Sequence, residues 1–158
     1  MAVIGKELLE ILEDPQTLKC IAATDRDGIP HISYKGTLHV EEDVIVFYDI
    51  LQSSQINKNL VHAIWFEKKV AISILSKDRQ SFHIVGVPFK CVTAGAYFEK
   101  TYERLRAEKG DVDLNAIWYI RPEQVRENTF SVRKAEEEQN YPVLKHIDRM
   151  IKPEFLEQ

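Results

Sequence analysis

Residues 17–49, TLKCIAATDRDGIPHISYKGTLHVEEDVIVFYD, contain three strand-like segments separated by two turn signals. The first segment, 17–24, is rich in apolar residues, and a second segment, 30–40, follows it closely. Between them stands Asp27-Gly28, a pair that tolerates the positive φ of a tight hairpin turn. The two segments are therefore predicted to pair as an antiparallel hairpin.

The third segment, 44–49, extends this pattern. Glu41-Glu42-Asp43 provides the turn before it, and its first half is apolar throughout, which predicts burial on both faces. Gly36 interrupts the middle strand and predicts a bulge or a close backbone approach. Because connections this short leave no room for crossover helices, we expect an antiparallel meander rather than a parallel sheet.

Helices and strands alternate along the rest of the chain. We expect helices at 1–14, 53–63 and 97–109, and strands at 70–76, 81–95 (bent at Gly86 and Pro88) and 114–121 (ended by Pro122). This order predicts a mainly β fold, a closed antiparallel barrel of six to seven strands. We treat 1–158 as a single domain whose polar C-terminal part, 131–158, is a helical extension, with a terminal helix indicated by Val143, Ile147, Met150 and Ile151.

Composition narrows the function classes. The chain has 158 residues, 44% of them hydrophobic, and a formal charge of −4, which argues against a nucleic-acid binder. No stretch approaches the ~20 apolar residues of a membrane span, and 1–14 lacks the pattern of a signal peptide, so we expect a cytoplasmic protein. Cys20 and Cys91 lie in strand-like segments and are predicted to be reduced and mostly buried.

No self-contained catalytic group is visible in the sequence. Neither a G-x-G-x-x-G nor a P-loop pattern occurs, and G-x-S-x-G is also missing. The five histidines are spread out, so no metal site is predicted. Five carboxylates fall in predicted turns, where they are expected to be solvated: Asp25, Asp27, Glu41, Glu42 and Asp43. This pattern favours a site whose chemistry belongs to a cofactor.

The order of elements resembles the pyridoxamine 5′-phosphate oxidase-like family of FMN-binding split barrels. The resemblance runs from about Leu18 to Val125. Its marks are 22–31 (AATDRDGIPH), 44–48 (VIVFY), Ser54 with Asn59-Leu60, 84–86 (IVG) and 116–122 (AIWYIRP).

The resemblance implies a homodimer that binds one FMN at each of two sites in the subunit interface. Backbone groups of two strands would bond the flavin ring edge, with Tyr48 or Phe47 against its face. The N-terminus of the inserted helix would hold the phosphate. The residues that match these positions are Ser33, Lys35, Gly36, Thr37, Phe47, Tyr48, Asp49, Ser53, Ser54, Gln55 and Lys58.

The sequence departs from the family in two places. The usual Ser-Arg-Lys phosphate clamp is Ser54-Gln55-Ile56 here, so that Lys58 or Lys35 would have to supply the cation. The end of the chain, 148–158, lacks the basic substrate-binding ending, which argues against a true pyridoxamine 5′-phosphate oxidase.

Structural roles compete with each of these assignments. Ser53 and Ser54 are equally suited to cap a helix, and Lys35 on a strand is usually solvated. Phe47 and Tyr48 are residue types that commonly pack in cores or interfaces, and Trp65 and Trp118 are also expected to pack. Three functions follow: an FMN-dependent oxidoreductase or electron carrier, a non-catalytic ligand-binding dimeric barrel that has lost tight FMN binding, and a related barrel that binds haem or a deazaflavin.

Overall fold

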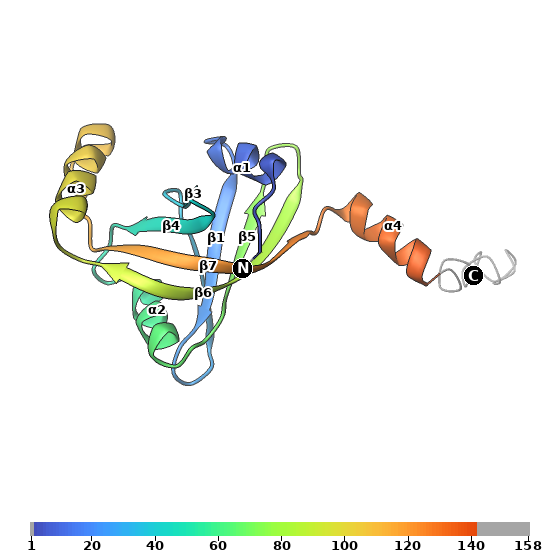
Figure 1. The fold of residues 1–158 in the computed structure, drawn as a ribbon, viewed down its shortest axis with the longest axis horizontal. Helices are drawn as coiled ribbons and strands as arrows, with labels where there is room; N and C mark the ends of the chain where they lie inside the picture. The colour runs from blue at the N-terminus through green and yellow to red at the C-terminus, as the bar shows by residue number, and fades with distance from the viewer. Residues whose placement is uncertain (1, 142–158) are drawn as a thin grey trace, which may run out of the picture.

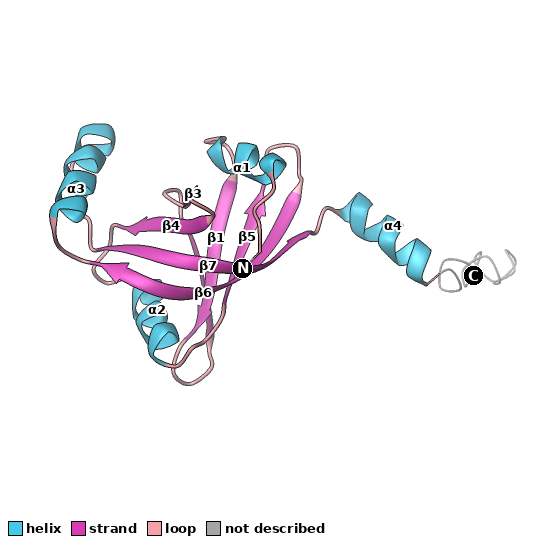
Figure 2. Cartoon of the chain, in the orientation of Figure 1, coloured by secondary structure: helices cyan, strands magenta, loops and turns pink. Residues whose placement is uncertain are grey.

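The computed structural model describes residues 2–141. They form one antiparallel sheet of seven strands, in the order β2-β1-β5-β6-β7-β4-β3, together with four helices (Figures 1 and 2). The mainly β prediction is confirmed. The elements are α1 (Lys6–Glu13), β1 (Leu18–Thr24), β2 (Pro30–Tyr34), β3 (His39–Glu41), β4 (Val44–Asp49), α2 (Gln55–Trp65), β5 (Val70–Leu75), β6 (Ser81–Val92), α3 (Ala96–Lys109), β7 (Ala116–Glu127) and α4 (Phe130–Asn140).

The two edges of the sheet are joined by a single short segment. β2 and β3 stand at opposite ends of the strand order, yet only residues 35–38 separate them. Because one residue of extended chain spans at most about 3.6 Å, this segment holds the two edges within roughly 18 Å of each other. The sheet is therefore curled into a barrel. Figure 1 shows the result, with β6, β7 and β4 crossing β1 and β5.

The predicted strand 30–40 is therefore two strands. Its first half pairs with β1, as in Cys20 opposite Tyr34, and its second half pairs with β4, as in His39 opposite Val46. Gly36 lies in the break, where the sequence predicted an irregularity. The meander is correct in its pairing, but its middle strand changes partner half-way.

The long β6–β7 pair carries the predicted bends. Register shifts occur between Val85 and Gly86 and between Pro88 and Lys90. The strand prediction was wrong at Pro122: β7 continues through it to Glu127. Pro122 pairs with Gly86 at the first register shift, where the ladder is already irregular and a missing N–H is tolerated.

Two apolar clusters lie on opposite faces of β4. Ile45 and Phe47 point into the barrel, whose core also includes Trp118 and residues of α1 and α2. Val46 and Tyr48 point to the outer face, where α3 packs. The prediction that this strand is buried on both faces is confirmed.

The packing predictions for two tryptophans and two cysteines have mixed outcomes. Trp118 is fully buried, as expected, but Trp65, the last residue of α2, is 78% exposed because the chain leaves the barrel surface there. Cys20 is buried and Cys91 is exposed, and both are free thiols. The burial prediction was wrong for Cys91, which lies near the end of β6, after the second register shift of this strand.

The last described helix, α4, projects away from the barrel (Figure 1). It begins at Phe130, close to the predicted start of the C-terminal extension, and none of its residues is buried. Val143, Ile147, Met150 and Ile151, which predicted a terminal helix, lie outside the described residues. Within residues 2–141, no helix is long and apolar enough to span a membrane.

Candidate functional site

A cleft of about 250 Å³ opens where the barrel closes, between the bend that joins β2 to β3 and the end of β4. We refer to it as the closure cleft. The last residue of α3 forms part of its wall. The closure cleft is lined by Ser33, Tyr34, Lys35, Gly36, Thr37, Tyr48, Asp49, Ile50, Leu51 and Lys109.

Six of the eleven residues predicted for the site line this cleft: Ser33, Lys35, Gly36, Thr37, Tyr48 and Asp49. Of the other five, Phe47 is fully buried in the barrel core, and Ser53, Gln55 and Lys58 are exposed at the start of α2. The fifth, Ser54, caps α2. Its Oγ accepts a hydrogen bond from the Asn57 backbone N–H at 3.2 Å.

The start of α2 adjoins the closure cleft. The backbone N–H of Ser54 donates to the carbonyl oxygen of Leu51, a cleft residue, at 3.1 Å. One turn, 51–54, therefore separates the cleft from the predicted residues at the start of α2, and the cleft itself stops before α2.

The floor of the closure cleft is an ion pair. Lys35 Nζ lies 3.3 Å from Asp49 Oδ1, and the two side chains are only 11% and 0% exposed. The same ammonium stands 5.5 Å from the centre of the Phe47 ring. Lys35 is thus held against the barrel end rather than solvated, and its charge is already neutralised by Asp49.

Thr37 and Tyr48 fasten the two walls of the cleft together. Thr37 Oγ1 donates to the Tyr48 carbonyl oxygen at 2.8 Å and accepts from the Tyr48 N–H at 3.1 Å. Both backbone groups of Tyr48 are therefore satisfied by one side chain at the point where the β3–β4 ladder stops. This contact fixes the width of the cleft.

The Tyr48 phenol is turned away from the barrel, toward α3. Its oxygen accepts a hydrogen bond from Arg104 at 2.7 Å and lies 3.2 Å from His39 Nε2. Burial raises the pKa of Tyr48 to about 12, against the smaller opposing effect of the Arg104 hydrogen bond, so the phenol stays protonated at neutral pH.

Comparison with known proteins identifies the fold. No protein-family profile and no curated protein matches the sequence. Solved structures do match. HupZ from Group A Streptococcus has 20% sequence identity and a TM-score of 0.65, with 81% of this chain and 96% of that one covered. A putative pyridoxamine 5′-phosphate oxidase from Lactobacillus delbrueckii has 15% identity and a TM-score of 0.62, covering 78% and 93%.

An FMN-binding protein from Syntrophomonas wolfei also matches, with 16% identity, a TM-score of 0.61 and 79% and 88% of the two chains covered. This chain has the pyridoxamine 5′-phosphate oxidase-like split-barrel fold. Proteins that share the fold differ in ligand: the other matches include an F420 reductase and HutZ, a heme storage protein from Vibrio cholerae.

The residues of the closure cleft fit part of a flavin better than all of it. On this split barrel, the cleft offers backbone groups along 33–37, a threonine hydroxyl and a buried ion pair to a ring edge. Its volume of about 250 Å³ is below the ~300–1,000 Å³ of typical cofactor sites. The cations available for a phosphate are Lys109 at the wall and Lys58 on α2, because Lys35 is paired.

Sequence reasoning missed four cleft residues: Tyr34, Ile50, Leu51 and Lys109. Tyr34, Ile50 and Leu51 are sequence neighbours of predicted residues and could have been included on that ground. Lys109 carries no such signal, because it ends α3, some sixty residues later in the chain. Only the packing of α3 on the outer face of β4 brings it to the cleft.

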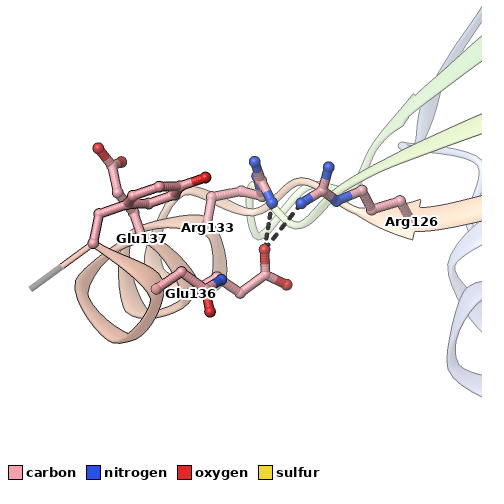
Figure 3. Close-up of a pocket in the computed structure, with 6 residues that line it drawn as sticks. Arg126, Arg133, Glu136 and Glu137 are labelled. Atoms are coloured by element: carbon pink, nitrogen blue, oxygen red, sulfur yellow. Dashed lines mark hydrogen bonds and ion pairs between the residues drawn. The ribbon is translucent and has the colours of Figure 1, made fainter.

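A second pocket, of about 330 Å³, lies between β7 and α4 (Figure 3). Arg126 and Arg133 both donate to one carboxylate oxygen of Glu136 there. Because both guanidinium groups bind Glu136 within the pocket, these contacts join α4 to β7. Within residues 2–141, no group of three or more potential metal-ligating side chains is close enough to hold a metal ion.

Proposed function

We propose that this protein is a flavoprotein that binds FMN at the closure cleft, in a site completed by a second copy of the chain. The proposal is supported by the way in which the fold brings the predicted residues together. Residues assigned to the flavin from sequence resemblance, in two segments separated by ten residues, line one cleft. When bound, a flavin supplies hydride or electron transfer, while the protein binds and orients it.

The second copy is proposed because one chain leaves the site open. The cleft is smaller than typical cofactor sites, and its rim exposes apolar side chains: Tyr34 is 71% and Leu51 is 62% exposed. Ile32, two residues before Tyr34 on the same face of β2, is 61% exposed. Exposed apolar groups gathered around a cleft are typical of an interaction surface.

The phosphate would lie at the N-terminus of α2, beside Ser53 and Gln55. Free N–H groups of a helix start and the helix dipole both favour an anion. Ser54 already uses its hydroxyl as the cap, so it strengthens the helix start rather than adding a donor. Lys58 is exposed one turn into α2 and is the nearest cation in the sequence that has no ion pair among the described residues.

The alternative function is a non-catalytic ligand-binding barrel. The pairing of Lys35 with Asp49 favours it, because this pairing removes one of the two cations that could replace the missing phosphate clamp. A haem-binding barrel is a further candidate, since HutZ, a heme storage protein, has the same fold at a TM-score of 0.57.

The test is a titration of the purified protein with FMN, riboflavin and haemin, followed by flavin fluorescence and haem absorbance. We expect saturable binding of FMN, weaker binding of riboflavin and no stoichiometric haem. Lys58→Ala should weaken FMN binding by roughly 10-fold, the loss of one charge-assisted contact, and leave riboflavin binding unchanged. Lys134→Ala, on α4, is the matched control.

Each other outcome selects a different function. Equal affinity for FMN and riboflavin would refute the phosphate site at α2. Stoichiometric haem without flavin binding would favour the haem barrel, and binding of none of the three would favour the non-catalytic barrel. Light scattering at micromolar concentration tests the second copy, and a monomer that still binds FMN would remove it from the proposal.

A further inference from the structure

The carboxylate of Asp49 is incompletely bonded. Asp49 is the last residue of β4, and its side chain is fully buried on the barrel face of the strand, two residues after Phe47. Oδ1 accepts from Lys35 Nζ at 3.3 Å and from the Leu51 N–H at 3.4 Å. Oδ2 is buried and has no hydrogen-bond partner among the described residues.

A buried carboxylate oxygen without a donor is unusual. A carboxylate can accept about four hydrogen bonds, and most buried polar atoms in folded proteins have at least one. Both contacts to Oδ1 are long for charge-assisted hydrogen bonds, which are typically about 2.7–2.9 Å. Asp49 also lines the closure cleft, so a water or a bound molecule in the cleft can supply a further donor.

Lys35 covers Asp49 on the side of the cleft. Its side chain is 11% exposed, and the ammonium ends a flexible four-carbon stem, so it can move aside without moving the strand. Such a movement leaves Asp49 without a cation. Only a ligand that offers Lys35 an acceptor and Asp49 a donor, side by side, compensates both charges.

From this arrangement we propose that the Lys35–Asp49 pair recognises an imide edge. A carbonyl oxygen of the ligand would accept from Lys35, and the adjacent N–H would donate to Asp49. The inference rests on the proposed function, because the pyrimidine-dione edge of a flavin carries this acceptor and donor in adjacent positions. It adds to that function a specificity determinant: ligands without the imide N–H are rejected, because the buried carboxylate stays unpaired.

The test compares FMN with 3-methyl-FMN, which lacks only the imide hydrogen and carries a methyl group there. In the wild-type protein we expect the methylated ligand to bind roughly 10- to 100-fold more weakly, the range expected from one charge-assisted hydrogen bond. Asp49→Asn keeps the shape of the side chain and can offer only a neutral acceptor. It should reduce this discrimination to below about 10-fold.

Two controls separate the inference from its alternatives. Asp43→Asn, in the exposed turn before β4, should leave the discrimination at its wild-type value. The N3 proton of ¹⁵N-labelled FMN should shift downfield on binding to the wild type and less on binding to Asp49→Asn. This readout requires no change in affinity.

The outcomes are distinct. FMN and 3-methyl-FMN binding equally well to the wild type would overturn the imide inference and leave the flavoprotein proposal standing. Discrimination that is the same in the wild type and Asp49→Asn would also overturn it, by assigning the effect to the bulk of the methyl group. If the wild type binds no FMN at all, both proposals fail.

Discussion

Replacing Lys35 with methionine tests the ion pair at the floor of the closure cleft. The substitution keeps the length of the side chain and removes its charge. Asp49, which is 0% exposed, then stays buried without a cation. Removing one partner of a buried pair typically costs about 3–5 kcal/mol, and we expect Lys35→Met to lower the free energy of unfolding by this amount.

Replacing the other partner of the pair, Asp49, should lower the free energy of unfolding by less, and the structure gives the reason. Asp49→Asn leaves a lysine whose side chain is already 11% exposed and flexible, so the Lys35 ammonium can turn into water. We expect a loss of about 1 kcal/mol, the value of an ordinary hydrogen bond. The double variant Lys35→Met/Asp49→Leu leaves no charge and should lie within about 1 kcal/mol of the wild type.

The assay is urea denaturation of the ligand-free protein at one fixed protein concentration, because association would make the midpoint depend on concentration. Tryptophan fluorescence reports unfolding, since Trp118 is fully buried and its Nε1 donates to Asn57 at 2.9 Å. Equal losses for Lys35→Met and Asp49→Asn would refute the asymmetry. A loss below 1 kcal/mol for Lys35→Met would refute the buried pair itself.

Three further predictions address the barrel and its surface. Gly86→Ala should destabilise the fold by about 1–3 kcal/mol in the same assay, because the new Cβ would lie 2.6 Å from Ile120 Cγ2. Gly5→Ala is the control and should not destabilise the fold, because the space around Gly5 is open. Raising the pH from 10 to 12 should lower the free energy of unfolding by about 2 kcal/mol through Tyr48, because its pKa of about 12 in the folded state lets the unfolded chain lose this proton first. The absence of such a fall in the wild type relative to Tyr48→Phe would contradict this prediction. One thiol per chain, the exposed Cys91, should react with a thiol reagent in the native protein. It should react more slowly than a free cysteine, because partial desolvation of its sulfur and the Asp49 charge raise its pKa. Labelling of both thiols would contradict the buried position of Cys20.

Local signals predicted most of the fold. Asp27-Gly28 specifies its hairpin through backbone conformation alone, and Gly28 has a φ of +81°. Gly36 marked the break in the second predicted strand. It did not indicate that the two halves of this strand pair with different neighbours. The prediction at Pro122 failed because a proline is tolerated where the opposite strand shifts register, and that shift depends on Gly86, which is distant in the sequence.

The chemistry of the site was less visible for a related reason. Lys35 lies in the segment between β2 and β3, fourteen residues before Asp49 at the end of β4, and only the closure of the barrel places the two side chains 3.3 Å apart. A lysine in a strand-like segment usually points to solvent, and nothing near Lys35 in the sequence indicates otherwise. Burial of a charge is a property of the curled sheet, so it could not be derived from the pattern of one strand.

Barrel closure and the cleft have the same structural origin. The sheet closes only if the chain turns between β2 and β3, and this turn must be fastened to β4, which Thr37 does by bonding both backbone groups of Tyr48. In this chain the turn leaves the backbone of 33–37 along the cleft and places the Lys35 side chain against the end of β4. A concave site at this point follows from the fold, whereas the residues at 35 and 49 can change without opening the barrel. Solved structures that share this fold are described as an FMN-binding protein, a heme storage protein and an F420 reductase. If the imide proposal is correct, the pair at the floor of the cleft selects the ligand of this chain, because a lysine held against a carboxylate with an unused oxygen favours a ligand that offers an acceptor and a donor together.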